Sequence, residues 1–561
     1  MKNLKKILAL LLVLALAVGM VACAKSEAPV EESKPAEESK TEEVKEEEPE
    51  AEPYTITISV QESPASKAGW EAVAAGYEAL NPNADVVVDL KPDEGYSDWV
   101  KTIGADYMNN TVDIVSINLV SDRKEGQTIN WNEYMEDVNP YDADGKIWKE
   151  TFSYNSQSKS SIDGSFDALS AFSVQVKWFY NADIFEEVGV TAPKTWDEFV
   201  DICAKIYDAG YQPLAIEGDY NSFYAMRMGW LSQMYADQTT RTQLEITRAQ
   251  PGDYCYDPDV DGKFVLDLTD PWNDDSANVN INNVRFWAAV ADGTLSANTP
   301  GTVAVWENFK KLWPKYAGGD AFFGTTDAMP LFYQGKAAIT VHVGGFGLTL
   351  ANNFKKIEAG ESLTTGSGED AEVIEGAKVF KVGSFNMPSM TNPSGKFGPD
   401  EIFQAPARTI EVATGFLGAF SRSAEQDAHC VDFMMYYFSA QGMSKYIDAF
   451  LANGGSVDGP NLVYGVEYPA EVAASFEGSE FIGNCQKQKC QAFARGLADN
   501  QESTRRFYEL AQQCLTDQIT CEDYARLMAE QHLQYMDEAM GTSISRSDLE
   551  NPANEPTGNE G

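Results

Sequence analysis

Apolar and polar residues alternate with two different periods along the chain. Residues 54–60 alternate apolar with polar side chains, which is typical of a strand with one buried face, and apolar residues then recur at helical spacing over 70–80. Asn81-Pro82-Asn83 ends that helix, and residues 86–90 resume a strand. Because strand and helix patterns follow one another in this way, the sequence predicts an α/β body.

Capping residues predict where several later helices begin. In Thr195-Trp196-Asp197-Glu198, the Thr195 hydroxyl can accept a hydrogen bond from the first turn, and the Glu198 carboxylate can accept one from Thr195. Ser423 and Thr520 stand in the same position before two further apolar stripes. After Gly541 the chain is polar and contains Pro and Gly, so we expect residues 542–561 to be a disordered tail.

The N-terminal segment has the pattern of a secretory leader. Three lysines within the first six residues precede an apolar run over 7–22, which falls short of the roughly 20 residues that span a bilayer. Its length and flanks are typical of a signal peptide, so residues 1–22 are predicted to be removed on export.

A cysteine follows this apolar run directly. Met20-Val21-Ala22-Cys23 resembles the lipobox of bacterial lipoproteins, and the resemblance implies that Cys23 is acylated. The alternative is ordinary cleavage after Ala22, which leaves Cys23 as a plain thiol. Residues 24–53 contain no aromatic residue and cannot bury enough apolar surface to offset their ordering entropy. We therefore expect residues 23–53 to be a lipidated cysteine followed by a disordered acidic tether.

The net charge of the chain argues against two classes of binding partner. It has 42 Lys and Arg against 86 Asp and Glu, a formal net charge of −44. A nucleic-acid backbone needs a cationic face, so we expect no nucleic-acid partner. The same charge argues against direct adsorption to anionic lipid.

Neither the cysteines nor the acidic residues form a recognisable metal motif. Seven cysteines remain besides Cys23, so at least one is unpaired in a monomer; Cys485 and Cys490 are the best local disulfide candidates, with buried thiols as the alternative. Asp257-x-Asp259-x-Asp261-Gly262 resembles the start of a calcium loop, but Leu268 stands where such a loop needs Glu. We predict a turn there, and no metal or cofactor.

The sequence gives little support for catalysis. Its three histidines, His342, His429 and His532, are far apart, and the zinc-protease, nucleophile-elbow and P-loop patterns do not occur. A glycosidase needs only two carboxylates, which an acidic chain always offers, so a secreted glycosidase stays as an alternative.

Several segments carry a family resemblance. Residues 178–185 read WFYNADIF and continue into VGVTAPKTWDEF at 188–199. Residues 332–340 read FYQGKAAIT, a Gly-Gly-Phe turn ends at Phe346, and residues 385–388 read FNMP. These segments, in this order, resemble family 1 of the extracellular solute-binding proteins, the maltodextrin-binding-like components of sugar ABC transporters. The resemblance covers residues 54–540, with extra length around 238–283 and 358–378.

The resemblance implies a periplasmic-binding-protein-like fold. In that fold two α/β lobes are joined by a hinge of crossing strands, and the ligand lies in the cleft between them. The body at 54–541 would divide into a first lobe of about 54–170 and 335–385 and a second of about 171–334 and 386–541. The chain would cross near 170–180, before 326–335 and after Phe385.

Candidate ligand contacts follow from strand ends and aromatic residues, because a sugar presents C–H faces to aromatic rings and hydroxyls to polar groups. For each polar residue the alternative is a surface turn, and for each aromatic residue it is core packing. The predicted contacts are Gln61, Glu62, Asn118, Asp122, Glu217, Asp219, Trp230 and Phe346.

The function implied by the resemblance is solute capture outside the cell. A lipid-anchored, monomeric protein on the outer face of the bacterial cytoplasmic membrane would bind a sugar, we expect an oligosaccharide, and deliver it to the permease of an ABC importer. Within the binding class, a peptide or another polar solute is the alternative ligand. A structural or adhesive surface protein is a further alternative.

Overall fold

Two β-sheets organise the part of the chain that can be described. The computed structural model describes residues 52–92, 95–117, 126–157, 166–365, 372–476, 480–487, 494–497, 501–541 and 543–558. Residues 53–561 form a unit of their own, separate from residues 1–52. The predicted signal peptide and the lipidated Cys23 lie outside the described residues, as does nearly all of the tether.

The first sheet has the strand order β11-β3-β1-β2. Its strands are β1 (Tyr54–Ser59), β2 (Ala84–Val88), β3 (Ile114–Val115) and β11 (Gly418–Ala419). Strand β1 pairs in parallel with both β2 and β3, and β11 pairs antiparallel with β3. The predicted strand at 54–60 is confirmed, and Ile56 and Ile58 point into the core as its alternation requires.

The second sheet has the order β10-β4-β6-β5, with β9 also paired to β4. Strand β4 is long because its first half pairs with β10 and its second half with β6 and β9. These pairs are antiparallel, and β5 is parallel to β6. The strands are β4 (Phe172–Asn181), β5 (Gln212–Leu214), β6 (Ala337–Val343), β9 (Val382–Phe385) and β10 (Glu411–Thr414), and a separate pair consists of β7 (Thr364–Thr365) and β8 (Glu372–Val373).

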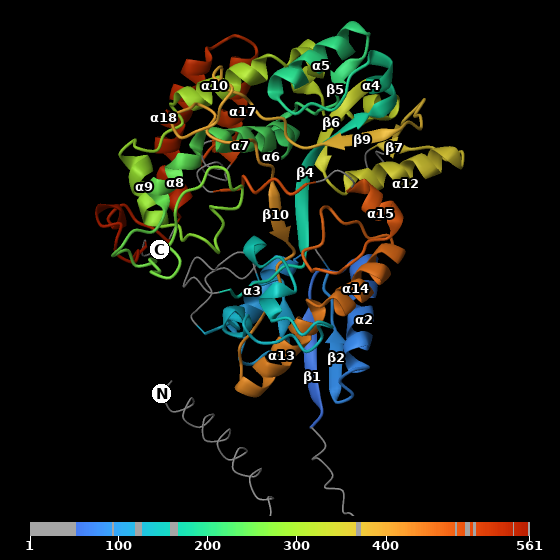
Figure 1. Cartoon of the computed structure of the whole chain (residues 1–561), viewed down its shortest axis with the longest axis vertical. Coiled ribbons are helices and arrows are strands. Elements are labelled where there is room, and N and C mark those ends of the chain that lie inside the picture. The colour runs from blue at the N-terminus through green and yellow to red at the C-terminus, as the bar shows by residue number, and fades with distance from the viewer. Residues whose placement is uncertain are drawn as a thin grey trace, which may run out of the picture. The chain divides into compact units, whose positions relative to one another are not determined.

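Helices cover both sheets (Figure 1). None that the structure describes has the length and apolar composition of a membrane span. The α-helices are α2 (Pro64–Glu78), α3 (Tyr96–Ala105), α4 (Ala182–Val188), α5 (Trp196–Asp208), α6 (Tyr220–Ala225), α7 (Arg227–Thr240), α8 (Leu244–Thr247), α9 (Asn283–Ala291), α10 (Pro300–Lys310), α11 (Met329–Tyr333), α12 (Phe346–Glu358), α13 (Ala424–Tyr437), α14 (Ala440–Ala452), α15 (Ala470–Ser475), α17 (Gln501–Leu515) and α18 (Cys521–Met540).

The predicted helix starts are confirmed by their hydrogen bonds. The Thr195 hydroxyl accepts from the backbone N–H of Glu198 at 3.3 Å, and the Glu198 carboxylate accepts from that of Thr195 at 3.2 Å. The hydroxyls of Ser423 and Thr520 also cap α13 and α18, by accepting from the backbone N–H groups of Gln426 and Asp523. These bonds join residues three apart, so the local sequence suffices to specify them.

The two largest buried cores define two lobes. One core surrounds the first sheet and includes residues from α13 and α14, and the other surrounds the second sheet. Most described residues within 54–171 and 415–476 therefore belong to the first lobe, and most of those within 176–410 and 480–558 belong to the second. Strand β4 and the segment through β10 connect the lobes (Figure 1).

Two segments lie in the opposite lobe from the one predicted for them. Residues 335–385, predicted for the first lobe, lie largely in the second, because β6 forms backbone bonds with β4 and β5. Conversely, α14 packs against α2 of the first lobe, with the ring of Tyr446 against that of Trp70. Strand β4, whose two halves pair with β10 and with β6, spans Phe172–Asn181.

The C-terminal segment also differs from its prediction. Residues 543–558 were expected to be disordered, yet the N–H of Tyr254 donates to the carbonyl of Ala553 at 2.8 Å, and the Asn282 amide donates to the carbonyl of Pro552 at 2.8 Å. The Asp548 carboxylate accepts backbone N–H groups from Ser545 and Thr557. A polar segment is thus held by hydrogen bonds that composition alone does not reveal.

The aspartates of the calcium-like segment build a turn. The Asp261 carboxylate accepts from the backbone N–H groups of Asp257 and Asn280, at 2.9 and 2.8 Å, and from the Asn280 side chain. The Asp257 carboxylate accepts from the N–H of Asp259 at 2.8 Å. These bonds account for the spacing of the acidic residues, as the turn interpretation predicts.

Candidate ligand-binding site

The carboxyl ends of β1, β2 and β3 in the first lobe and of β5 and β6 in the second lobe point toward each other. Strand β4 leads from the first lobe into the second, and because β6 is antiparallel to β4, β6 and its parallel neighbour β5 run back toward the first lobe. The chain leaves the second lobe through β10 and β11; β3 is antiparallel to β11, so β3, β1 and β2 run toward the second lobe. Ligands of open α/β sheets bind beyond the carboxyl ends of strands.

Gln61 and Glu62 lie at this end of the first sheet. The Gln61 side-chain oxygen accepts from the Ser116 hydroxyl at 3.0 Å, which ties the end of β1 to the end of β3. Glu62 is exposed, with its backbone N–H bonded to the carbonyl of Lys91 at 2.7 Å. Asn118 and Asp122, predicted on the loop after β3, lie outside the described residues.

Trp99 is an aromatic residue at the same end that the sequence analysis missed. It lies half-buried on α3, and the Lys91 ammonium is 5.3 Å from its ring centroid. Lys91 follows β2 and also pairs with Asp89 at 2.8 Å. The signal in the sequence was the lysine directly after a strand, but the helical spacing of Trp99 is equally typical of a core residue.

Glu217 follows β5, as predicted, but it forms an internal ion pair. Its Oε2 accepts from Nε of Arg227 at 2.5 Å and its Oε1 accepts from the backbone N–H of Ala328 at 3.3 Å. Both side chains of the ion pair are buried, and the Arg227 guanidinium also donates to the carbonyl of Val341 at 2.8 Å. Glu217 therefore holds Arg227 in place, and both of its oxygens already accept hydrogen bonds.

Trp230 and His342 lie beside this ion pair. Trp230 is half-buried in the first turn of α7, with the Arg227 guanidinium carbon 6.0 Å from its ring centroid. Burial, and secondarily the Arg227 charge, lower the pKa of His342 to about 3, so the imidazole is neutral at physiological pH. The Nδ1 of His342 accepts from the N–H of Val343 at 3.0 Å. Its other ring nitrogen is therefore the one that carries the proton.

Asp219 and the aromatic residues of α6 extend this surface. One Asp219 oxygen caps α6 by accepting from the N–H of Asn221 at 3.1 Å, while its Oδ2 is buried without a hydrogen-bond partner among the described residues. Tyr220 and Tyr224 stack at 6.3 Å, and the Arg505 guanidinium lies 4.3 Å from the Tyr220 ring centroid. Both tyrosines are half-buried.

Phe346 lies in the core rather than on this surface. Its side chain is only 6% exposed, and His342 stacks on it at 4.3 Å with an interplanar angle of 14°. Phe179 and Phe332 contact it from the side of the second sheet. The side chain is thus almost fully buried, which favours the packing alternative over the predicted sugar-stacking role.

Buried polar residues join the two crossing strands. Gln175 of β4 donates to Oε2 of Glu411 of β10 at 3.4 Å, and the same oxygen accepts from the backbone N–H of Ile482 at 3.1 Å. Burial raises the pKa of Glu411 to about 7, and Oε1 of Glu411 has no partner among the described residues. A carboxyl group that titrates near neutrality thus lies at the connection between the lobes.

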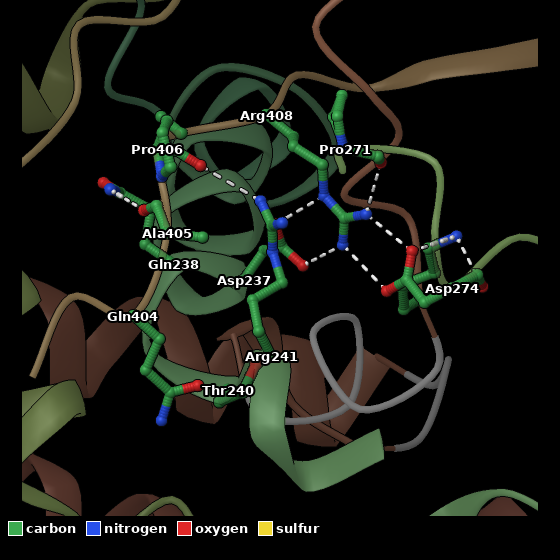
Figure 2. Close-up of polar contacts among 12 residues, drawn as sticks. Asp237, Gln238, Thr240, Arg241, Pro271, Asp274, Gln404, Ala405, Pro406 and Arg408 are labelled. Atoms are coloured by element: carbon green, nitrogen blue, oxygen red, sulfur yellow. Dashed lines mark hydrogen bonds and ion pairs between the residues drawn. The ribbon is translucent and has the colours of Figure 1, made fainter. Parts of the chain in front are cut away.

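A buried network of charges anchors the segment that leads into β10. Figure 2 shows the Arg408 guanidinium between the carboxylates of Asp237 and Asp274. Arg241 donates to Asp237 at 2.7 Å and to the carbonyl of Pro406 at 3.0 Å. Lys487 approaches Asp274 at 3.2 Å, so the network also reaches the segment beyond the last lobe crossing.

This network explains part of the extra length of the chain. Asp274 belongs to the long stretch at 238–283, and the carbonyl of Pro271 also accepts from Arg408 at 2.9 Å. The stretch is therefore part of the second lobe, bonded to the segment that continues into a crossing strand.

A surface hollow of about 490 Å³ lies at the other end of the second sheet. Residues 210–211 and 334–336, which precede β5 and β6, line it together with residues 375, 376 and 378. None of the predicted ligand contacts lines this hollow, because they follow strands rather than precede them.

The sequence of residues 61–442 matches the model of the family described as bacterial extracellular solute-binding protein. The chain belongs to that family. No curated protein matches this solute-binding protein. Among solved structures, a family 1 extracellular solute-binding protein from Bifidobacterium longum subsp. infantis is similar, with 15% identity over 86% of this chain and 99% of that one and a TM-score of 0.50. The two-lobed α/β fold class is thereby confirmed.

Two further solved structures are similar to this solute-binding protein. One is the cyclic alpha-maltosyl-1,6-maltose binding protein from Arthrobacter globiformis, with 13% identity, 86% and 98% coverage and a TM-score of 0.48. The other is the apo form of RafE from Streptococcus pneumoniae, with 16% identity, 87% and 99% coverage and a TM-score of 0.49.

Proposed function

We propose that this solute-binding protein captures a carbohydrate between its lobes and delivers it to the permease of an ABC importer. The observation that carries the proposal is the pair of facing strand ends, each with a half-buried tryptophan beside a cationic side chain. These are Trp99 with Lys91 in the first lobe and Trp230 with Arg227 in the second.

The chemistry of these residues fits a sugar. An indole ring covers the C–H face of a pyranose and gains from the burial of apolar area. The guanidinium of Arg227 and the neutral imidazole of His342 are hydrogen-bond donors for hydroxyl oxygens, and the Asp219 carboxylate is an acceptor. The side chain of Gln61 serves the same hydroxyl belt from the first lobe.

The predicted contacts then divide by role. Gln61, Asp219 and Trp230 remain proposed ligand contacts, as do Glu62, Asn118 and Asp122. Glu217 becomes a positioning residue, because its carboxylate fixes the Arg227 guanidinium. Phe346 becomes a packing residue behind His342.

Delivery would follow closure of the lobes about the crossing strands β4 and β10. Such closure is a hinge motion that a ligand drives by binding both lobes at once. The proposed lipid on Cys23, with a tether of about 30 residues that extends up to roughly 100 Å, would keep the protein at the outer membrane surface. A permease would then meet the closed, loaded form.

A ligand screen tests the proposal. The chain from residue 24 onward is titrated with an oligosaccharide panel and with a peptide mixture, while its melting temperature and the integrity of each sugar are followed. A ligand that binds only the folded state stabilises it by about 2.7 kcal/mol at a hundredfold excess over Kd. We expect one sugar series to raise the melting temperature without any product. A rise with peptides alone would reject the carbohydrate ligand, and sugar cleavage would favour the glycosidase.

A further inference from the structure

Two cysteines meet where α17 turns into α18. Cys514 lies in the last turn of α17 and Cys521 is the first residue of α18, and their sulfur atoms are 3.5 Å apart. Both side chains are buried, with exposed fractions of 0% and 5%. Cys203 and Cys430, also buried thiols, belong to other helices, α5 and α13.

The turn between these cysteines is held by its own hydrogen bonds. The N–H of Asp517 donates to the carbonyl of Cys514 at 3.2 Å, and the N–H of Gln518 donates to that of Gln513 at 2.8 Å. The Thr520 hydroxyl then caps α18 by accepting from the N–H of Asp523 at 3.1 Å. The backbone geometry of this turn therefore brings Cys514 and Cys521 close to each other.

We propose that Cys514 and Cys521 form a disulfide bond in the exported protein. A disulfide has a sulfur–sulfur distance of about 2.05 Å, so the two atoms must approach by about 1.5 Å, which side-chain rotation can supply. Extracellular compartments are where disulfides form and persist. The proposal rests on the extracellular location that the family description gives, and it is independent of the ligand.

The bond needs an oxidant, for which a small-molecule disulfide such as oxidised glutathione suffices. The Cys521 thiolate attacks one sulfur of the oxidant and releases one thiolate, which leaves a mixed disulfide on Cys521. Cys514 then loses its proton and attacks the Cys521 sulfur, which releases the second thiolate. Two protein thiols are oxidised by two electrons in total, and one small disulfide is reduced to two thiols.

The surroundings favour Cys521 as the attacking group. A hydrogen bond from the Cys514 thiol lowers the pKa of Cys521, although burial raises it. The nearby Lys310 ammonium also lowers this pKa. Lys310 is held nearby through its ion pair with Asp517 of the turn.

The bond would stiffen a wall of the candidate ligand site. From α17, the Tyr508 hydroxyl donates to the carbonyls of Gly218 and Phe323, at 3.2 and 3.1 Å, and Thr504 shares a hydrogen bond of 2.5 Å with Tyr220. A disulfide between α17 and α18 would thus restrain the helix that supports the segment after β5.

Peptide mapping of the exported full chain tests the proposal directly. The protein is denatured without reductant, alkylated and digested, and we expect a cross-linked Cys514–Cys521 peptide that disappears after reduction. The same assay on Cys514→Ser should show Cys521 alkylated, whereas the control Cys203→Ser should retain the cross-link. Recovery of both cysteines as alkylated thiols, even after incubation with oxidised glutathione, would overturn the proposal, as would a cross-link from either to another cysteine.

A thermal measurement supplies a second readout on the wild-type chain. We expect the melting temperature to fall by a few degrees in reductant, because opening the bond enlarges the unfolded ensemble. Cys203→Ser should show the same fall, and Cys514→Ser should show none. A wild-type melting temperature that does not respond to reductant would count against the bond.

Discussion

The Arg408 guanidinium and the Asp237 carboxylate form a two-pronged ion pair deep in the second lobe. Arg408 Nε and Nη2 donate to the two Asp237 oxygens at 2.9 and 2.6 Å, and neither side chain is more than 2% exposed (Figure 2). Asp237 belongs to α7, whose first turn carries Trp230, and Arg408 lies just before the crossing strand β10. The ion pair therefore joins the helix that carries Trp230 to the strand that links the two lobes.

Breaking this pair should strongly destabilise the protein. Arg408→Met leaves Asp237 and Asp274 buried with less compensation, and we expect a loss of about 3–5 kcal/mol in the free energy of unfolding. Chemical denaturation measures it. Arg526→Met is the control and should have little effect, because Arg526 is exposed and its recorded partners, Asp523 and Glu530, belong to its own helix. Equal effects of the two variants would contradict a structural role for the buried network.

Glu411 should make stability depend on pH. Its pKa is raised by burial from 4.5 to about 7, so the folded state binds this proton more tightly than the unfolded state does. The stabilisation that Glu411 adds to the free energy of unfolding is fully present below pH 4.5 and is lost as the pH rises through 7. The change amounts to about 3 kcal/mol.

The test for Glu411 is a difference between two titrations. His342 and His532, whose pKa values are lowered to about 3 by burial, shift stability in the opposite direction between pH 3 and 6.5, so the wild-type curve alone mixes these groups with Glu411. Glu411→Gln keeps the shape of the side chain without the charge, and the difference from wild type should follow the window between pH 4.5 and 7. A difference that is flat across this window would rule out the assigned titration.

Trp230→Ala should weaken sugar binding. We expect a loss of about 1–3 kcal/mol in binding free energy, as for a buried aromatic anchor. Isothermal titration with the sugar found in the screen measures it, with circular dichroism to verify folding. Tyr207→Ala is a matched control: Tyr207 also has a cation over its ring, Lys315 at 5.3 Å, but it lies before β5 rather than after it. Unchanged affinity in Trp230→Ala would remove this residue from the site.

Phe346→Ala should act on stability. The ring fills space between His342, Phe179 and Phe332, so its truncation creates a cavity that costs about 3–5 kcal/mol. Thermal unfolding without ligand reveals this loss. If the variant kept its stability and lost only affinity, the ring would be a ligand contact after all, as the sequence pattern first indicated.

The sequence by itself determined the local elements and the family. The caps at Thr195 and Ser423 and the alternation of β1 depend on residues two or three apart, so these features could be predicted without a partner segment. The segments around residues 178–199 also established the resemblance that the family match confirms.

Only the tertiary structure decided the roles of single side chains. Whether Glu217 contacts a ligand or Arg227 depends on a residue ten positions further along the chain. Whether Phe346 is exposed or buried depends on packing between several separate segments. The assignment of β6 and α14 to lobes depends likewise on backbone pairing and packing over more than a hundred residues. Such choices are made by burial and by hydrogen bonds between distant segments, which no local pattern encodes.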